Sequence, residues 1–403
     1  MKKTVAIALA IVMVLSLAAC GGSAPAAPAA SSAPAASSAP AESAAPAAES
    51  SDTILIGVSA SSTGSAPING QRTIEGARLA VEEINAAGGV LGKMLELYEA
   101  DDGGTTDTAM NAINLIASQN VVAQVGPNLS GLTMAIESMM SDNKIPFLVG
   151  ATSPKLVTQV HNEYMFRIRA SDSIQASVAA KYITDDLGCT KIGLLTDSDD
   201  YGSGAKNVAI EYFETNNIEY VSEEFNSGDA DLSAQVLKLQ AAGVDGVIVW
   251  AHDTETALAA QNLYDYGMTC PIVGSTSIST QQVINLCEAE WLTNWYSVTD
   301  FTSTNPDERV AAFVKNFNDK YGADPELYAA TYYSSIYIVA DAIERAGSVD
   351  REAIREALTK TADFNGGVLA TYTADENREM VHQSVICQIV DGVAQYYTTV
   401  YVD

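Results

Sequence analysis

The sequence predicts an α/β protein with two doubly wound lobes, each built on a parallel sheet. From Ile54 onward, short and almost wholly apolar runs alternate with segments of helical periodicity. This is the pattern of strands that helices cover on both faces. The alternation breaks near Arg167-Ile-Arg169 and then restarts. The chain of 403 residues is also long enough for two domains, because one core serves roughly 100–200 residues.

The first block of elements begins with the strand-like run Ile54–Val58. In the helix expected over Gln71–Ala87, apolar residues recur at spacings of 3, 4 and 3, which places them on one helical face. Gly88-Gly89 ends this helix. Further expected strands are Leu95–Ala100, Val121–Val125 and Pro146–Val149, and the helices between them are Thr106–Ser118 and Leu132–Asp142.

The second block repeats the alternation after the break. It contains, in order, helix Ser173–Leu187, strand Lys191–Thr196, helix Ala205–Thr215, strand Ile218–Glu223, helix Leu232–Ala242, strand Gly246–Trp250, helix Thr254–Tyr266 and strand Pro271–Gly274. Three long helical stretches come next, over Asp307–Tyr321, Leu327–Ala346 and Asp350–Lys360. Two strand-like runs close the chain, at Val368–Tyr372 and Val385–Val390.

The N-terminal segment predicts export and lipid attachment. Lys2 and Lys3 precede an apolar stretch that is short for a membrane span, and small residues lead to Cys20. This resembles a bacterial lipobox, so residues 1–19 are expected to be a signal peptide and Cys20 the lipidated first residue. An ordinary secretory signal is the alternative. Residues 20–52, rich in Ala, Pro and Ser, are expected to form a tether. The predicted location is extracytoplasmic, on the cell membrane.

Composition narrows the function further. The formal net charge is -29, which argues against nucleic acid and against docking on anionic lipid head groups. After the leader, no apolar run is long enough for a transmembrane helix. Four cysteines remain besides Cys20, with no metal-binding spacing. They could form one or two disulfides, with Cys270 and Cys287 the nearest pair in sequence, or stay as free thiols.

An ordered set of motifs carries a family resemblance. The segment Gly76–Gly89 is followed by Leu91-Gly-Lys93, Asp101-Asp102, Gly126–Ser130, Gly150–Pro154, Asp197–Gly202, Asp245–Val249 and Thr331-Tyr332. Together they resemble the branched-chain amino-acid (Leu/Ile/Val) binding proteins, which are type I periplasmic binding proteins of ABC importers. The resemblance covers nearly all of Thr53–Asp403.

The resemblance implies two lobes joined by three hinge crossings, with the ligand between them. The crossings are expected near Arg169-Ala170, Thr299–Phe301 and Gly366-Gly367. Lobe 1 would then comprise residues 53–170 and 302–366, and lobe 2 residues 171–301 and 367–403. The implied partners are a small-molecule solute and an ABC permease of the branched-chain amino-acid type.

Ligands of doubly wound sheets bind beyond the carboxyl ends of the strands. In lobe 1 the hydroxyl-rich loop Ser59–Ser65 follows the first strand, with Ser62 as a candidate contact. The resemblance implies that Ser130 holds the α-carboxylate of the ligand and that Thr152 contacts its α-amino and carboxylate groups. Gly150 offers a carbonyl. The alternative is that Ser130 and Thr152 only cap helices.

In lobe 2, Tyr201 occupies the place of a family tyrosine that covers the ligand. The chain departs from the family at three positions. Thr276 replaces a glutamate that pairs with the ligand ammonium, and His252 and Asn69 replace two tyrosines. Because an unpaired buried ammonium is costly, either Asp253 or Glu255 substitutes for the glutamate, or the ligand is not a free α-amino acid. Asp197, Asp199 and Asp200 lack calcium-loop spacing and are interpreted as solvated turn acids.

No enzyme signature is present: the sequence has no G-x-S-x-G, H-E-x-x-H, P-loop or strand-to-helix G-x-G-x-x-G motif. No cofactor and no metal are expected. The predicted function is therefore an extracytoplasmic solute-binding protein of an ABC importer, which captures a small amino acid or related carboxylate. The alternative is a sensor of the same fold that presents its ligand to a receptor kinase or chemoreceptor.

Overall fold

The computed structural model describes residues 53–64 and 67–401. The described residues belong to one compact unit, and its buried apolar residues form four core clusters. The predicted signal peptide, Cys20 and the tether lie outside the described residues. Within the described ranges, no helix is both long and apolar enough to span a bilayer.

The first sheet has five strands in the order β2-β1-β3-β4-β5, and every pair of neighbours is parallel. The strands are β1 (Thr53–Ala60), β2 (Met94–Asp101), β3 (Ala123–Val125), β4 (Phe147–Val149) and β5 (Met165–Arg167). We call this sheet, with everything packed on it, lobe 1.

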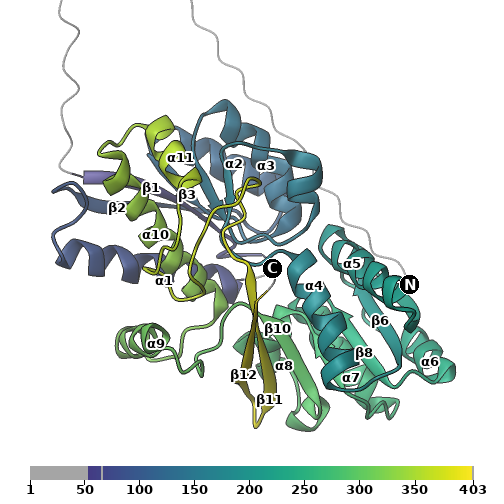
Figure 1. The fold of residues 1–403 in the computed structure, drawn as a ribbon. Helices are drawn as coiled ribbons and strands as arrows, with labels where there is room; N and C mark the ends of the chain where they lie inside the picture. The colour runs from purple at the N-terminus through teal and green to yellow at the C-terminus, as the bar shows by residue number, and fades with distance from the viewer. Residues whose placement is uncertain (1–52, 65–66, 402–403) are drawn as a thin grey trace, which may run out of the picture. The chain divides into compact units, whose positions relative to one another are not determined.

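Helices cover both faces of this sheet (Figure 1). On one face lie α1 (Pro67–Ala86), α9 (Glu308–Tyr321), α10 (Leu327–Ala346) and α11 (Arg351–Thr359), and on the other lie α2 (Thr106–Ala117) and α3 (Ser130–Asp142). The apolar stripe of α1 packs closely against α10 because Gly76 lets the two backbones meet. A Cβ at this position would lie 2.1 Å from the Ala329 carbonyl oxygen.

The second sheet has seven strands in the order β12-β11-β10-β9-β8-β6-β7, and we call it, with the helices on its two faces, lobe 2. The strands are β6 (Lys191–Asp197), β7 (Glu219–Phe225), β8 (Gly246–Trp250), β9 (Ile272–Gly274), β10 (Trp295–Thr299), β11 (Gln383–Val390) and β12 (Val393–Tyr401). One face carries α4 (Asp172–Lys181) and α5 (Asp200–Asn216), and the other carries α6 (Ser233–Ala242), α7 (Asp253–Asp265) and α8 (Gln281–Leu286).

The predicted α/β class is confirmed, but lobe 2 is not wholly parallel. Strand β11 runs antiparallel to both β10 and β12, and the pair forms the long hairpin seen in Figure 1. Asp391 and Gly392 connect its two strands, both with positive φ. Such a two-residue turn can only join antiparallel strands.

The run Val368–Tyr372 is not a strand of either sheet. It is buried in the core of lobe 1, and the backbone N–H of Val368 donates to the Ser334 hydroxyl of α10 at 3.0 Å. Its apolar character therefore reflects packing on a helix. Strands β5 and β10, which we did not predict, are short or mixed in polarity.

The chain passes from lobe 1 to lobe 2 between β5 and α4, and returns between β10 and α9. The third passage corrects our expectation of a crossing near Gly366-Gly367. Val368–Ala370, Tyr372, Met380 and Val381 still pack in the core of lobe 1, and the chain joins the second sheet only at Gln383. The reason is that burying the apolar side chains of this segment against α10 keeps it on lobe 1.

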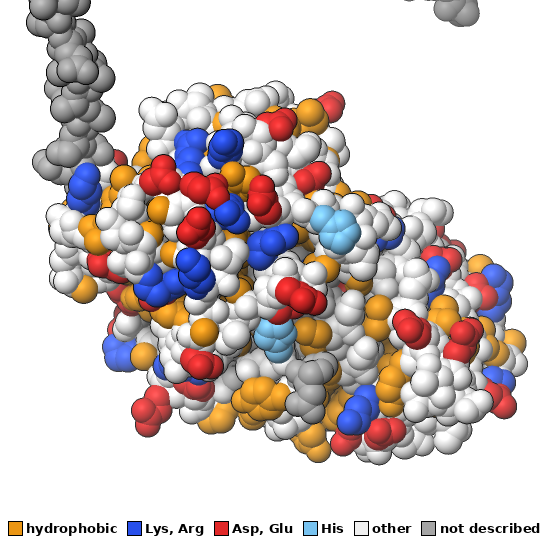
Figure 2. Space-filling view, turned by 45° about the horizontal axis from the view of Figure 1, so that its top comes forward, with side chains coloured by type: hydrophobic (Ala, Val, Ile, Leu, Met, Phe, Trp, Pro, Cys, Tyr) orange, Lys and Arg blue, Asp and Glu red, His pale blue; other side chains and the backbone are white. Residues whose placement is uncertain are grey.

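Acidic and basic side chains are interspersed on the face shown in Figure 2. The blue Lys and Arg side chains on that face have red Asp and Glu neighbours and form no continuous basic surface. This mixed surface is in keeping with the formal net charge of -29 of the whole chain.

Candidate functional site

Loops at the carboxyl ends of both sheets meet between the lobes. Asn69 at the start of α1 donates from Nδ2 to Oδ2 of Asp253, the first residue of α7, at 2.8 Å. Farther along, the Ser153 hydroxyl donates to the Asp200 carbonyl at 3.2 Å, and Lys155 pairs with the Asp200 carboxylate. The two lobes are therefore in direct contact around the region where a doubly wound fold binds its ligand.

A cavity of about 320 Å³ lies at this junction. Lobe 1 lines it with residues from α1, two loops and the start of α10: Asn69, Gly104, Leu129 and Tyr328. Lobe 2 lines it with the loops after β7 and β8 and the start of α7: Ser227, His252, Asp253, Thr254 and Glu255. A cavity with walls from both lobes and of this size suits a small solute.

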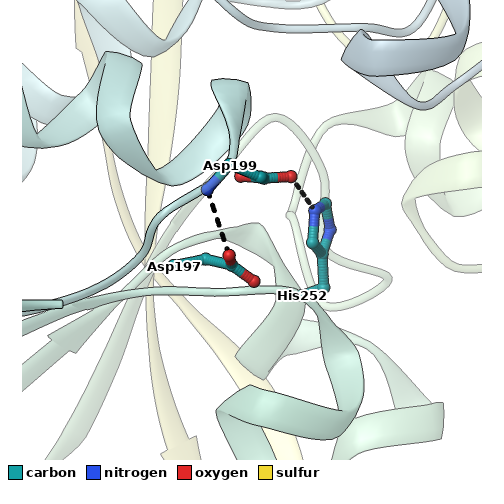
Figure 3. Close-up of side chains that lie close together, drawn as sticks. All are labelled: Asp197, Asp199 and His252. Carbon is teal, nitrogen blue, oxygen red and sulfur yellow. Dashed lines mark hydrogen bonds and ion pairs between the residues drawn. The ribbon is translucent and has the colours of Figure 1, made fainter. Parts of the chain in front are cut away.

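His252 is held in the cavity wall by two neighbours. Its Nε2 lies 2.8 Å from Oδ2 of Asp199 (Figure 3), and its ring stacks on Tyr201 with centroids 4.9 Å apart. Burial lowers the pKa of His252, but the hydrogen bond and charge of Asp199 outweigh burial, so the net pKa is raised above 6.5. The imidazole therefore carries its positive charge to a higher pH than a free histidine.

The negative charges of Asp199 and Asp197 both help to raise the pKa of His252. Our interpretation of Asp197 as a solvated turn acid is wrong. Asp197 is fully buried; it accepts from the Ser227 hydroxyl at 2.9 and 2.8 Å and from the Asp199 backbone N–H at 3.1 Å. Asp199 caps α5 by accepting from the N–H groups of Tyr201 and Gly202. Both acids fold back on their own lobe because each satisfies backbone or hydroxyl donors there.

These two aspartates and His252 could also hold a cation. One ligand atom from each lies within 4.8 Å of the others. However, hydrogen bonds to protein groups already engage both oxygens of Asp197 and both oxygens of Asp199. The hydrogen bonds account for the close approach of these groups without an ion.

Arg169 binds two of the residues that we expected to contact the ligand, Gly150 and Thr276. Its Nη1 donates to the Gly150 carbonyl at 3.2 Å, and its Nη2 donates to the Thr276 hydroxyl at 3.1 Å. Asp300 balances the guanidinium charge at 2.7 Å. An internal cation thus takes these two acceptors, and a side chain of the hinge contacts both lobes.

Asp172, the first residue of α4, is a buried carboxylate that sequence reasoning missed. It is 0% exposed, and neither of its oxygens has a hydrogen-bond partner among the described residues. Burial raises its pKa to about 7, although the Thr152 hydroxyl and the Arg169 and Arg167 guanidinium groups oppose this shift. Asp172 in turn raises the pKa of Tyr201, second to the effect of burial. Thr152, Asp172 and Tyr201 are therefore neighbours.

The structure separates the predicted site residues into three groups. Asn69 and His252 line the cavity, and the Tyr201 ring stacks on the His252 ring without lining the cavity. Ser130, Gly150, Thr152 and Thr276 are buried next to the cavity but do not line it. The Ser130 hydroxyl accepts from the Ser153 N–H at 3.1 Å and does not cap α3, whose N-cap residue is Leu129. Ser62 lies in a different hollow, beside Pro67 and Ile68 of α1.

Asp253 and Glu255 were considered as substitutes for the family glutamate, and both line the cavity. Tyr328, Arg169 and Asp172 carried no sequence signal of their own. Asp172 is a polar residue at the start of a helix, next to an expected crossing between the lobes. That combination would have been a sequence signal for a site residue. The four cysteines in the described part of the chain are unpaired: Cys189, Cys270, Cys287 and Cys387.

Comparisons with known proteins agree with this architecture. A model of the periplasmic binding protein family matches residues 53–394. A Leu/Ile/Val-binding protein of Rhizobium johnstonii is 29% identical over 312 residues, covering 76% of this chain and 83% of the relative. A Leu/Ile/Val-binding protein homologue of Brucella suis is 28% identical over 328 residues, covering 80% of this chain and 86% of the relative.

Two solved structures are similar over most of their length. A leucine-binding protein of Thermotoga maritima superposes with a TM-score of 0.80 and 28% identity, covering 86% of this chain and 99% of the other. A branched-chain amino acid transporter substrate-binding protein of Streptococcus pneumoniae, in complex with isoleucine, gives a TM-score of 0.79 and 28% identity, covering 87% and 99%. The chain therefore belongs to the periplasmic binding protein family, whose members are extracytoplasmic solute-binding proteins.

Proposed function

We propose that this protein is the substrate-binding subunit of an ABC importer and captures a small amino acid or related carboxylate between its lobes. The observation that carries the proposal is the cavity whose walls come from the carboxyl ends of both sheets. A ligand in that position contacts both lobes at once, so its binding energy favours the closed arrangement. The relatives named as Leu/Ile/Val-binding and as transporter substrate-binding proteins support an amino-acid ligand and an ABC permease as partner.

We assign the amino group of such a ligand to Asp172, a fully buried carboxylate that neighbours Tyr201 but is not itself among the residues that line the cavity. A fully buried carboxylate with two unpartnered oxygens is costly. A ligand ammonium that reaches Asp172 would donate hydrogen bonds to these two oxygens. This assignment removes the difficulty posed by Thr276, because the carboxylate comes from the start of α4 rather than from the loop after β9.

The contacts between the lobes define the motion that the function needs. On opening, the Asn69–Asp253 hydrogen bond and the Lys155–Asp200 ion pair would break. Each of these is a single polar contact and not part of a large apolar interface. The free energy of binding a small solute can therefore shift the equilibrium between the open and closed forms. No covalent chemistry is part of this cycle, and the protein acts as a binder without enzymatic turnover.

The N-terminal segment supports a role at the membrane surface. Cys20 would carry the lipid, and residues 20–52 would hold the binding unit near the permease at a high effective concentration. Cys20 and the tether lie outside the described residues. The acidic composition leaves the lipid as the main contact with the membrane.

The test is a thermal-shift and calorimetry screen of residues 51–403, which form one compact unit, against amino acids, amides and small carboxylates. At least one solute is expected to raise the melting temperature and bind with one-to-one stoichiometry. Asp172→Asn should weaken that binding, whereas Asp185→Asn, on the exposed side of the turn after α4, should leave it unchanged. Binding that survives Asp172→Asn intact would overturn the assignment of the amine partner.

A further inference from the structure

The cavity carries a set of hydrogen-bond acceptors in its own wall, and Asp172 is not one of its lining residues. Asn69, Asp253 and Glu255 lie along it, and we call them the acceptor wall. Each is buried, with 7, 8 and 8% of its surface exposed. Asn69 belongs to lobe 1 and the two acids belong to lobe 2, so this wall is complete only when the lobes are in contact.

The hydrogen bond between Asn69 and Asp253 fixes the direction of the Asn69 amide. A carboxylate accepts but does not donate, so the amide NH₂ of Asn69 must face Asp253, as the 2.8 Å contact from Nδ2 to Oδ2 shows. The other end of the amide, Oδ1, is then an acceptor. It is buried and has no hydrogen-bond partner among the described residues. A buried unpartnered acceptor on a cavity wall indicates a missing donor.

Glu255 brings a second carboxylate to the cavity wall, beside that of Asp253. Its Oε1 accepts from the Gly228 N–H at 2.8 Å, which holds the side chain against the loop after β7. Asp253 and Glu255 bring two carboxylates to the cavity, and no Lys or Arg is among its lining residues. His252 is the one lining group there that gains a positive charge, and Asp199 already pairs with it. Arg169 and Arg72 engage Asp300 and Glu326 instead.

The chemistry of the missing group follows from these contacts. Acceptors with negative charge select a cation, and the unpartnered Oδ1 of Asn69 requires that the cation carry N–H bonds. Leu129 and the ring of Tyr328 line the same cavity and offer apolar contacts to an aliphatic stem. A branched apolar side chain would leave Asn69 Oδ1 unpartnered and bury the two carboxylates against hydrocarbon, which is unfavourable.

We propose that the acceptor wall binds an N–H-bearing cationic end group, a primary ammonium or a guanidinium, on an aliphatic stem. The ligand would then be a basic amino acid or an aliphatic diamine, not a branched-chain amino acid. This inference rests on the proposed function of the cavity and goes beyond it, because the relatives are named for Leu, Ile and Val. The two sources of the cation differ in whether an α-carboxylate is also present.

Calorimetry on wild-type residues 51–403 with matched ligands tests the proposal without any variant. Lysine and arginine represent basic amino acids, cadaverine and agmatine represent the same end groups without a carboxylate, and norleucine is lysine without its charge. Nε-trimethyllysine keeps the charge but has no N–H at that end. Lysine, arginine or one of the two amines is expected to bind at least tenfold more tightly than norleucine, leucine and trimethyllysine.

Comparing lysine and arginine with cadaverine and agmatine then shows whether the ligand is a basic amino acid or an amine without a carboxylate. Equal or tighter binding of leucine or norleucine would overturn this inference and leave the proposed function in place. If trimethyllysine binds as well as lysine, the requirement for N–H donors is wrong and the proposal fails. Failure of every amino acid, amine and carboxylate to bind would overturn both the inference and the proposed function.

Variants locate the effect within the cavity. Asp253→Asn and Glu255→Gln keep the side-chain shape, and removal of one buried charge partner should weaken binding of the cationic ligand by roughly 30-fold or more. Asp265→Asn changes the same charge at the exposed end of the same helix α7 and should have no effect. Circular dichroism and urea midpoints check that each variant is folded. Unchanged affinity in both folded acceptor-wall variants would overturn the proposal.

Discussion

Arg169 and Asp300 form a buried ion pair, with Nε and Oδ2 2.7 Å apart, between the two segments by which the chain leaves lobe 1 and returns to it. Their side chains are only 6 and 1% exposed. The Asp300 carboxylate also accepts from the Ala170 N–H and from Gln175. Because Arg169 also binds Gly150 in lobe 1 and Thr276 in lobe 2, this pair links the two connecting segments to both lobes.

Asp300→Asn should destabilise the protein strongly. The variant leaves the Arg169 guanidinium buried without its counter-charge, and breaking a buried pair from one side costs about 3–5 kcal/mol of unfolding free energy. Urea unfolding measures this loss. Asp319→Asn, which removes an ion pair between two largely exposed side chains on α9, is the control and should change stability by less than about 1 kcal/mol. Equal effects in the two variants would contradict a stabilising role for the pair.

Ligand binding should release a proton from Asp172. Its pKa in the folded protein is about 7, so below that pH an ammonium ligand must displace the proton before it can pair with the carboxylate. The apparent affinity should therefore fall by about tenfold per pH unit below 7. Calorimetry at pH 6 in buffers of different ionisation enthalpy counts the released protons. About one proton is expected for the wild type and none for Asp172→Asn.

The same carboxyl group makes stability depend on pH in the absence of ligand. Its folded-state pKa lies above its ordinary value of 3.8, so between these pH values the folded protein holds the extra proton. The contribution of Asp172 to unfolding free energy is then greatest at acid pH and decreases as pH rises from about 4 to 7. Asp172→Asn should flatten this part of the profile, and an unaltered slope would argue against a buried, protonated Asp172.

Asp199→Asn should lower the pKa of His252. Asparagine still caps α5, so the variant mainly removes the charge that raises the His252 pKa. In the wild type, the pair contributes stability that is fully present below pH 6.5 and is lost as pH rises through the higher folded-state pKa. We expect a stability difference of about 0.5–1 kcal/mol at pH 6 and less at pH 8.5, because both side chains are about one-third exposed.

Nuclear magnetic resonance titration of the His252 ring measures the pKa directly. Asp350→Asn is the matched control. Asp350 also caps a helix, because it accepts from the backbone N–H groups of Glu352 and Ala353 at the start of α11, but it makes no hydrogen bond to a histidine among the described residues. The control should leave the His252 titration unchanged. A His252 pKa that is the same in wild type and Asp199→Asn would show that the contact in Figure 3 does not control its charge.

Gly76→Ala should separate α1 from α10. The added Cβ would lie 2.1 Å from the Ala329 carbonyl oxygen, which is backbone and cannot rotate away. Overpacking of this kind costs about 1–3 kcal/mol or more. Gly131→Ala in α3 is the control: nothing lies within 4 Å of its added Cβ, so stability should stay the same or rise. Chemical denaturation of both variants compares them, and equal midpoints would contradict the close helix contact.

Cys20→Ser should abolish lipid attachment. The lipid predicted at Cys20 requires a thiol, and the acidic body offers no second membrane signal of its own. In cells grown with labelled fatty acid, the wild type should carry label in the membrane fraction, and the variant should be unlabelled. Ser23→Ala, three residues along, is the control. Label retained by Cys20→Ser would refute the anchor.

Much of the fold could be predicted because its local signals are strong. The long helix expected over Leu327–Ala346 is α10, with the same bounds, since its apolar side chains repeat at the helical period on a face that packs against α1. The strand run Gly246–Trp250 is β8, buried at every position. The errors lie in short elements. For Val368–Tyr372, burial against a helix produces the same apolar run as burial in a sheet.

The site could be located from the sequence only in outline. Asn69 and His252 line the cavity because loops at the carboxyl ends of parallel strands meet by topology. The partners of Gly150 and Thr276 could not be predicted, because the guanidinium that binds them comes from Arg169, on the hinge. Nothing in the residues around Gly150 or Thr276 indicates that a side chain more than a few positions away will reach them.

The sequence by itself determined the α/β class, the order of most strands and helices, and the family, because each of these depends on residue patterns within one segment. The tertiary structure decided the direction of β11, the burial of Asp172 and the pairing of Asn69 with Asp253. The physical reason is that charge, hydrogen bonding and burial at the site depend on groups brought together from both lobes. Because these groups are far apart in the sequence, no local sequence pattern predicts their contacts.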